Sequence, residues 1–148
     1  LESFIDFQEK LHQNICRKRK LVSIGTHDLD TITGPFTYTA LPPKDIRFRT
    51  LTLDKEYNGP EILDIYRKNK NYKQFVDIIE NYPLYPVVLD STNTILSLPP
   101  IINSYHSRLT SNTKNIFIEC TATDLVKAKI VLNSIVTCFS KYSAKPFT

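Results

Sequence analysis

Methionine and tryptophan are absent from this chain of 148 residues, and glycine and cysteine each occur only three times. Because methionine is missing even from position 1, we interpret the chain as a processed product or a domain cut from a larger protein. The glycines stand singly, so there is no glycine-rich phosphate loop to bind a nucleoside triphosphate. The cysteines are odd in number and far apart, which favours a reducing compartment over a disulfide framework or a thiolate zinc site.

Long apolar runs are also missing. No run approaches the roughly 20 residues that a bilayer-spanning helix needs, so we expect no membrane segment. Hydrophobic residues nevertheless make up 41% of the chain, with eight Tyr and eight Phe, which is typical of a folded globular protein. A chain of this length can bury about two-thirds of its unfolded surface. We therefore expect one globular domain over residues 1–148.

Catalytic motifs are equally scarce. The three histidines have no metal-ligand spacing (His12, His27 and His106). His27 with Asp28 and Asp30 is only a weak suggestion of a site, and the simpler interpretation of each histidine is a surface or hydrogen-bonded side chain. No G-x-S-x-G elbow marks a nucleophilic serine. Composition and spacing alone therefore indicate a soluble mixed domain and no particular chemistry.

Positive charge is modestly in excess, with 19 Lys and Arg against 15 Asp and Glu, and it gathers in two places. The first cluster is Arg17, Lys18, Arg19 and Lys20, and the second is Arg67, Lys68, Lys70 and Lys73. Two interpretations are open for each cluster. It can contact nucleic acid phosphates, or it can be a solvated surface or helix C-terminus that favours cations.

Apolar spacing predicts helices and strands that alternate irregularly. The predicted helices cover residues 2–16, 59–66, 72–80 and 125–139, and the predicted strands cover 21–24, 35–41, 46–53, 85–89, 94–98 and 116–120. Asn58 is a candidate N-cap for the second helix, and Thr123 with Asp124 for the last one. We predict an α/β (α+β) fold in which a mixed β-sheet is flanked by helices.

One stretch stands out because eight of its thirteen residues, from Asn103 to Asn115, are Asn, Ser or Thr. We interpret it as a loop that can line a pocket with neutral hydrogen-bond donors and acceptors.

Five stretches of the sequence resemble one known family. They are KLHQNICRKR, LVSIGTHDLDTITGPFTYTA, IIENYPLYPVVLDS, ILSLPPIIN and TKNIFIECTATD. In this order they are similar to the B3/B4 domain of the phenylalanyl-tRNA synthetase beta subunit, in its archaeal and eukaryotic cytosolic form. The likeness covers nearly the whole chain.

The resemblance implies an editing domain that hydrolyses tRNA(Phe) wrongly charged with tyrosine, within a cytoplasmic enzyme. It implies no cofactor for this fragment, since the alpha subunit of the parent enzyme forms the aminoacyl bond with ATP and Mg²⁺. The implied partners are tRNA(Phe), the alpha subunit and the rest of the beta subunit, in an alpha2beta2 heterotetramer without a membrane. The alternative is a non-catalytic RNA-binding or subunit-packing module, whose function the basic clusters would carry.

The resemblance also implies roles for individual residues. Glu119 in IFIEC matches the glutamate of the bacterial L-L-E-C motif, which recognises the tyrosine hydroxyl; the alternative is a solvent-facing strand residue. Asn103 falls at a glycine whose backbone helps to form the bacterial pocket, and His106 matches a histidine beside it. Thr37 replaces a bacterial histidine that positions the hydrolytic water, and a threonine cannot act as a base near pH 7.

Hydrolysis is therefore expected to depend on a placed water, on donors for the oxyanion and on the vicinal ribose hydroxyl, rather than on a protein base. The predicted polar wall consists of Ser104, Thr110, Asn112, Thr121, Thr123 and Asp124. We assign four residues to catalysis: Thr37, Ser104, Thr121 and Asp124. We assign six residues to substrate binding: Asn103, His106, Thr110, Asn112, Glu119 and Thr123. Asp124 has the helix N-cap as an alternative role. We assign RNA binding to the first basic cluster, Arg17, Lys18, Arg19 and Lys20.

Overall fold

A computed structural model describes residues 1–144 of the chain. They form two compact units, one made of residues 1–24 with the segment from Glu119 onward and one made of residues 25–118. Strands β1 (Val22–Asp28) and β8 (Ile116–Ala122) pair as a two-stranded sheet, and each strand has residues in both units.

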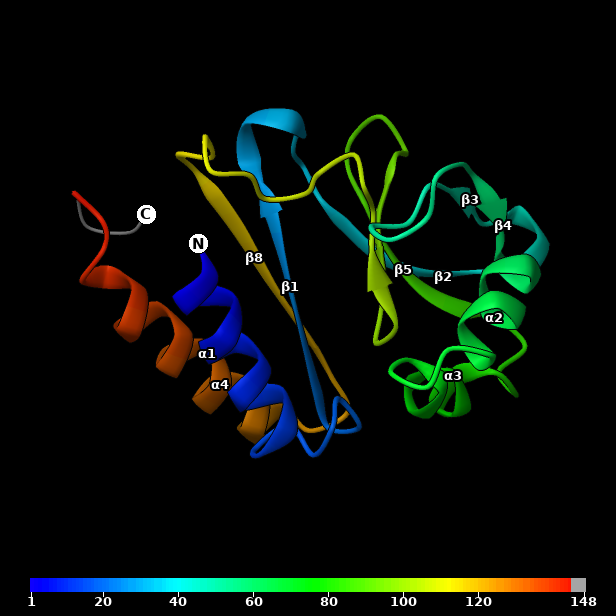
Figure 1. The fold of residues 1–148 in the computed structure, drawn as a ribbon, viewed down its shortest axis with the longest axis horizontal. Helices are drawn as coiled ribbons and strands as arrows, with labels where there is room; N and C mark the ends of the chain where they lie inside the picture. The colour runs from blue at the N-terminus through cyan, green and yellow to red at the C-terminus, as the bar shows by residue number, and fades with distance from the viewer. Residues whose placement is uncertain (145–148) are drawn as a thin grey trace. The chain divides into compact units, whose positions relative to one another are not determined.

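The first unit contains helices α1 (Glu2–Gln13) and α4 (Leu125–Ser140), which lie side by side (Figure 1). The rings of Phe4 and Phe139 meet edge to face with their centroids 3.8 Å apart. Val131 and Ile135, one turn apart on α4, are fully buried, as expected for the inner face of an amphipathic helix. None of the helices in the described part of the chain has the length and apolar character needed to cross a membrane.

His12 connects α1 to strand β1 inside the first unit. The Ile24 N–H donates to His12 Nε2 at 2.9 Å, and His12 Nδ1 lies 3.0 Å from Glu9 Oε1. Because Nε2 accepts a hydrogen bond, the neutral ring carries its hydrogen on Nδ1 and donates it to Glu9. Burial is the main cause that lowers the pKa of His12 from its ordinary value. The interpretation of His12 as a hydrogen-bonded histidine is confirmed.

The chain leaves α1 through a left-handed turn, which ends the helix three residues before the predicted boundary. Arg17, Lys18 and Arg19 have φ angles of 47°, 54° and 63°. Side chains other than glycine adopt this region at a cost of roughly 1–2 kcal/mol each. The Lys18 N–H donates to the His12 carbonyl at 2.7 Å, so the turn folds back on the last helical residues.

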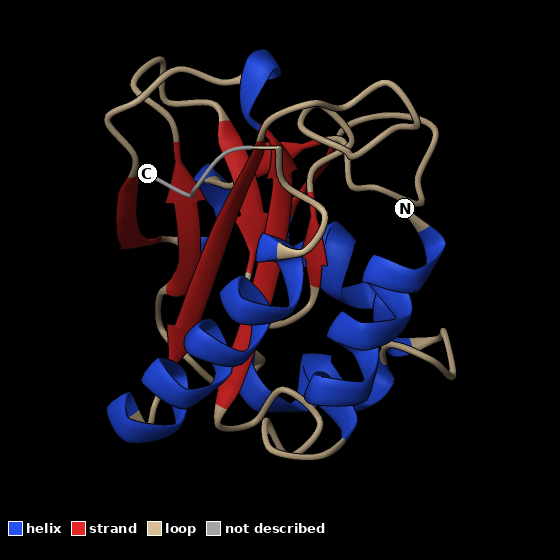
Figure 2. Ribbon diagram, turned by 90° about the vertical axis from the view of Figure 1, so that its left-hand side faces the viewer, coloured by secondary structure: helices blue, strands red, loops and turns tan. Residues whose placement is uncertain are grey.

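The second unit is built on a four-stranded sheet, whose strands are drawn in red in Figure 2. The strand order is β2 (Thr37–Leu41), β5 (Tyr85–Leu89), β6 (Ile95–Leu98) and β7 (Ile102–Asn103), and neighbouring strands are antiparallel. The turn between β5 and β6 is closed by Asp90, whose Oδ1 accepts hydrogen bonds from the N–H groups of Thr92 and Thr94. The predicted hairpin of residues 85–98 is confirmed.

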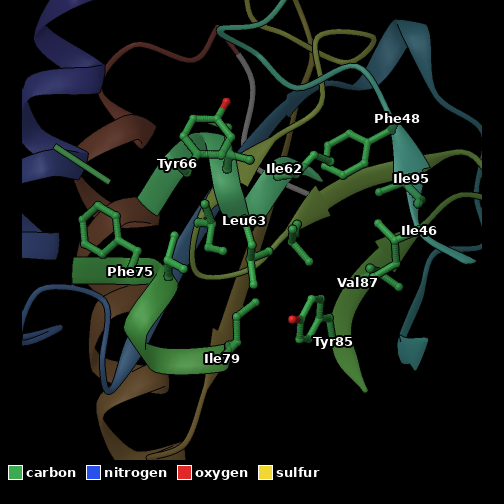
Figure 3. Packing of buried hydrophobic residues seen from close by; sticks show 14 residues of the cluster. Ile46, Phe48, Ile62, Leu63, Tyr66, Phe75, Ile79, Tyr85, Val87 and Ile95 are labelled. Carbon is green, nitrogen blue, oxygen red and sulfur yellow. The ribbon is translucent and has the colours of Figure 1, made fainter. Parts of the chain in front are cut away.

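Helices α2 (Gly59–Arg67) and α3 (Lys73–Ile79) pack with this sheet around the main core (Figure 3). The core residues are Ile46, Phe48, Ile62, Leu63, Tyr66, Phe75, Val76, Ile79, Tyr85, Val87, Ile95, Leu98, Ile101 and Ile102. Helix α2 starts with a capping box. The Asn58 side chain accepts from the Glu61 N–H at 3.0 Å, and Glu61 Oε2 accepts from the Asn58 N–H at 2.9 Å. The predicted N-cap is confirmed.

The α/β class is confirmed, and within residues 1–144 the strands are divided among three small sheets. Strand β1 is longer than predicted, because its polar end from Thr26 to Asp28 is buried. The extended segment predicted over 46–53 is a strand only in β3 (Arg47–Phe48), which pairs with β4 (Tyr57–Asn58). The chain turns at Leu51, just after Thr50 bridges to Ser104.

Candidate functional site

The polar stretch found in the sequence is attached to the end of strand β1 through Asp28. Thr113 Oγ1 donates to Asp28 Oδ2 at 2.6 Å, and the Asp28 N–H donates to the Ser107 carbonyl at 2.9 Å. The side-chain amide of Asn115 donates to Asp30 Oδ1 at 3.0 Å. A buried carboxyl group is costly unless it is hydrogen-bonded. Much of the short polar chemistry of this stretch therefore serves to hold Asp28 and the loop together.

Two predicted substrate-binding residues in the stretch bond within the loop itself. The Thr110 N–H donates to Thr113 Oγ1 at 2.9 Å, and the Asn112 N–H donates to Thr110 Oγ1 at 3.2 Å. The side chain of Asn112 is exposed, whereas Thr110 is half-buried. The Thr110 hydroxyl is thus an acceptor that shapes the turn.

Asn103, Ser104 and His106 are near neighbours in the sequence and belong to the second unit. The Asn103 amide donates to the Thr26 carbonyl at 3.3 Å, and Ser104 Oγ accepts from the His106 N–H at 3.2 Å. His106 Nε2 lies 2.9 Å from the carbonyl oxygen of Thr31. Asn103 thus ties the loop to strand β1, His106 ties it to the segment that follows β1, and Ser104 braces the loop internally.

His27 is buried beside an aromatic pair that the sequence analysis missed. Its Nδ1 lies 2.7 Å from Ser107 Oγ. The Phe36 and Phe117 rings stack with centroids 4.1 Å apart, and the His27 ring lies 6.0 Å from that of Phe117. In the sequence these phenylalanines look like ordinary apolar strand residues. The cluster of His27, Phe36 and Phe117 becomes visible only in the folded structure. It provides an apolar surface of the kind that an aromatic ligand needs.

Thr37 starts strand β2 and is exposed. It lies opposite Leu89 in the ladder. Its hydroxyl can hydrogen-bond a water molecule, but it cannot accept a proton as a general base.

The remaining predicted residues belong to the first unit. Glu119 is half-buried on β8, and its Oε2 atom is buried, so it is not a fully solvent-facing strand residue. Thr121 is also half-buried. Thr123 is exposed, and its hydroxyl donates to the Lys20 carbonyl at 3.3 Å. Asp124 is the N-cap of α4, where its Oδ1 accepts from the backbone N–H of the third helical residue at 3.0 Å, which confirms its alternative role.

The four predicted RNA-binding residues differ in their exposure. Arg19 is tied to Glu9, since its Nη2 lies 2.9 Å from Glu9 Oε1 and only 16% of its side chain is exposed. Arg17, Lys18 and Lys20 are exposed. These three are the members of the cluster whose charge reaches solvent.

Two of the thiols are poor nucleophiles. Burial raises the pKa of Cys16 to about 11 and the pKa of Cys120 to about 12. Both groups therefore stay protonated near neutral pH. Within residues 1–144, no group of three or more His, Cys, Asp or Glu side chains could hold a metal ion.

A cavity of about 680 Å³ opens in the second unit beside the predicted residues Ser104 and His106. Its apolar lining comes from Leu41, Phe48, Leu89 and Ile95, and its charged lining from Asp45, Arg47, Arg49 and Glu56. Asn93, Thr94 and Tyr105 complete it. Its volume suits a small organic group with both apolar and polar parts.

Comparison with known proteins places these features in a family context. A family model described as the B3/4 domain matches residues 1–143. The chain is 62% identical over 147 residues to the phenylalanine–tRNA ligase beta subunit of Homo sapiens, an alignment that covers 99% of this chain and 25% of that protein. It is 61% identical over 145 residues to the cytoplasmic phenylalanine–tRNA ligase beta subunit of Arabidopsis thaliana, with 98% of this chain and 24% of that protein covered. The chain thus spans about a quarter of the length of the curated relatives it matches.

A solved structure has the same fold. The crystal structure of an N-terminal fragment of the phenylalanyl-tRNA synthetase beta subunit from Pyrococcus horikoshii matches with a TM-score of 0.88 and 35% sequence identity. The match covers 95% of this chain and 40% of that one.

Proposed function

The chain belongs to the B3/4 domain family, and from this premise we propose that it is the editing domain of a phenylalanine–tRNA ligase beta subunit. Its reaction is hydrolysis of the ester that joins tyrosine to mischarged tRNA(Phe). A site that only excludes an extra hydroxyl discriminates about a hundredfold, whereas a site that hydrogen-bonds the hydroxyl discriminates by about 10⁴ to 10⁵. A separate site that recognises the tyrosine phenol is therefore the effective way to remove this error.

The observation that carries the proposal is the placement of Glu119. It occupies the position in IFIEC that matches the phenol-recognising glutamate of the bacterial relatives, and it is half-buried on β8. A carboxylate is a strong acceptor for a phenol O–H. Phenylalanine offers no such donor, so its ester gains nothing from this contact.

The hydrolytic step needs no protein base in this proposal. Water adds to the ester carbonyl carbon, the bond from that carbon to the ribose oxygen breaks, and the proton lost by water ends on the released ribose hydroxyl. The vicinal ribose hydroxyl can relay that proton, since it is held next to the reacting oxygen. Thr37 and Thr121 can orient water through their hydroxyl groups, whereas the Asp124 carboxylate is already used as a helix cap.

The same premise extends to partners and location. We propose that the domain works within a longer beta subunit, assembled with an alpha subunit in a cytoplasmic alpha2beta2 enzyme that charges tRNA(Phe) with ATP and Mg²⁺. Arg17, Lys18 and Lys20 are exposed cations that can contact the tRNA backbone.

A deacylation assay tests the function directly. Tyr-tRNA(Phe) and Phe-tRNA(Phe) are incubated with the chain and with the complete synthetase that contains it, and amino acid release is measured. We expect release of tyrosine only. Loss of a hydrogen bond to a carboxylate costs about 1.5–3 kcal/mol, so Glu119→Ala should lower kcat/KM for Tyr-tRNA(Phe) by roughly ten- to a hundredfold.

Asp77→Ala provides the matched control, because it removes an exposed carboxylate from α3. It should leave tyrosine release unchanged. Absence of tyrosine release by the complete synthetase, or equal rates for the wild type and Glu119→Ala, would refute the proposal. A supporting measurement is the Tm in the presence of free amino acids, which tyrosine should raise and phenylalanine should not.

A non-catalytic packing module is the second candidate, favoured by the exposed apolar residues of α4. Leu125 is 70% exposed, Val126 68% and Ile130 46%. Exposed apolar side chains that gather in a patch mark a surface that packs against another part of a larger protein. The deacylation assay separates the two candidates, because a packing module releases no tyrosine.

A further inference from the structure

Tyr105 lies between two arginines in the second unit. The Arg49 Cζ atom is 3.6 Å from the centroid of the Tyr105 ring, and the Arg108 Cζ atom is 3.8 Å from it. Guanidinium groups prefer the faces of aromatic rings, where the quadrupole is negative. The three side chains are referred to below as the Arg–Tyr–Arg stack.

Hydrogen bonds to backbone carbonyl groups hold the stack in place. The Tyr105 N–H donates to the Arg49 carbonyl at 2.9 Å, and Arg49 Nε donates to the Leu53 carbonyl at 2.9 Å. Arg108 Nη1 donates to the Tyr105 carbonyl at 3.2 Å. Arginine normally loses up to about 2 kcal/mol of side-chain entropy when it is immobilised. In the stack much of this ordering is present before any ligand arrives.

The positive charge of the stack is not neutralised within the described part of the chain. Arg49 and Arg108 form no ion pair there. By contrast, Arg67 on α2 forms two ion pairs: its Nη1 lies 3.0 Å from Asp64 Oδ1, and its Nη2 lies 2.7 Å from Glu80 Oε2. Two like charges held on one ring without carboxylate partners favour an anion.

Arg49 and Tyr105 also line the cavity of about 680 Å³. Arg47 is a further cation in its lining, although Glu56 Oε2 lies 3.6 Å from its Nε. That pair is exposed and therefore weak. The cavity combines a fixed guanidinium with the apolar surfaces of Phe48 and Ile95.

We propose that the Arg–Tyr–Arg stack and this cavity bind one nucleotide of single-stranded RNA, with a phosphate on Arg49 and the base against the apolar lining. Planar guanidinium groups bind phosphate through paired hydrogen bonds. Bases of single strands can enter a pocket readily, whereas a duplex base must first be unpaired and unstacked at a cost of a few kcal/mol. The inference rests on the proposed function, since it names where the unpaired end of the tRNA substrate touches the domain.

The test is equilibrium binding of a fluorescein-labelled single-stranded RNA that reproduces the 3′ end of tRNA(Phe), followed by fluorescence anisotropy over a series of salt concentrations. Loss of a charge-assisted contact corresponds to a ten- to hundredfold rise in Kd, which we expect for Arg49→Gln. The slope of log K against log salt should become flatter by about 0.7, the value for one contact on a single strand. Arg49→Lys should keep the slope but lose part of the affinity.

Arg67→Gln is the matched control, because it removes the same charge from a side chain already paired with two carboxylates. Its Kd should stay within twofold of the wild type. Equal losses for Arg49→Gln and Arg67→Gln would overturn the proposal. Equal binding of an RNA duplex would overturn the assignment to a single strand.

Glu56→Gln covers the case in which an Arg49 variant fails to fold. Glu56 is exposed and opposes an anion in the cavity, so its neutralisation should strengthen RNA binding severalfold. Unchanged or weaker binding would contradict the proposal. If RNA binding depends on Arg49 but no tyrosine is released, only the editing function is refuted. If tyrosine is released but the RNA affinity is the same with and without Arg49, only this inference is refuted.

Discussion

Replacement of His12 tests how much one buried imidazole, which joins α1 to β1, contributes to the free energy of unfolding. In His12→Ala, the Ile24 N–H loses its acceptor at a position where Ile24 is only 4% exposed. A buried donor without a partner costs about 1–3 kcal/mol, and the lost ring leaves a cavity that adds to this. We expect a loss of about 3–5 kcal/mol in the free energy of unfolding. For a chain of this size Tm falls by about 2–4 °C per kcal/mol, so the transition should move down by roughly 6–20 °C.

The pH dependence of stability gives a sharper result. Burial, the largest cause, lowers the pKa of His12 from its ordinary value of 6.5, so the unfolded chain binds a proton at a higher pH than the folded chain does. Stability contributed by neutral His12 is therefore complete above pH 6.5 and is lost as the pH falls through the lower folded value. Protonation also removes the Nε2 lone pair that accepts from Ile24.

His12→Gln separates the two effects. The glutamine oxygen can accept from the Ile24 N–H but does not titrate, so this variant should keep most of the stability near neutral pH and lose the decline just below pH 6.5. Glu9 titrates in a lower window, because the hydrogen bond from His12 lowers its pKa below 4.5. Urea unfolding at several pH values measures both. An unchanged decline below pH 6.5 in His12→Gln, with His106→Gln as the exposed control, would refute the reasoning.

Three further outcomes follow from local features. Lys18→Gly should raise the free energy of unfolding by up to about 1 kcal/mol, because glycine adopts the positive φ of 54° without strain. Lys18→Val should lower the free energy of unfolding, and chemical denaturation measures both changes. Asn58→Ala should cost about 1 kcal/mol by opening the capping box, with Glu61→Gln as the milder partner variant, and thermal melts that show no difference would contradict this. Cys16 and Cys120, with pKa values raised to about 11 and about 12, should resist iodoacetamide at pH 8 in the native chain and react after unfolding, as peptide mass spectrometry would show.

Elements with local signals were predictable from the sequence. Strand β5 runs from Tyr85 to Leu89 as predicted, because an apolar run bounded by turn residues defines it. The start of α2 was also predictable, because Asn58 and Glu61 are only three residues apart and form the capping box with each other. The Asp124 cap belongs to the same class.

Features built from distant residues were not predictable. The polar end of β1 looked like a connection, because the partners that allow its burial are far along the chain: Ser107 is 80 residues from His27, and Thr113 is 85 residues from Asp28. The Arg–Tyr–Arg stack likewise depends on a backbone bond between Arg49 and Tyr105. Periodicity reports which face of an element is buried, but it does not report which distant segment covers it.

The loop from Asn103 to Asn115 satisfies many of its polar groups before any ligand is present, through bonds such as those of Thr110 and Thr113. Its consequence is kinetic. A loop that must fold around its ligand slows association, whereas a preformed loop leaves the association rate to diffusion and charge. Under the proposed editing function, differences in affinity among aminoacyl esters at a site bordered by this loop should then reside in their dissociation rates. Correct and incorrect esters would arrive equally fast and differ in how long they stay.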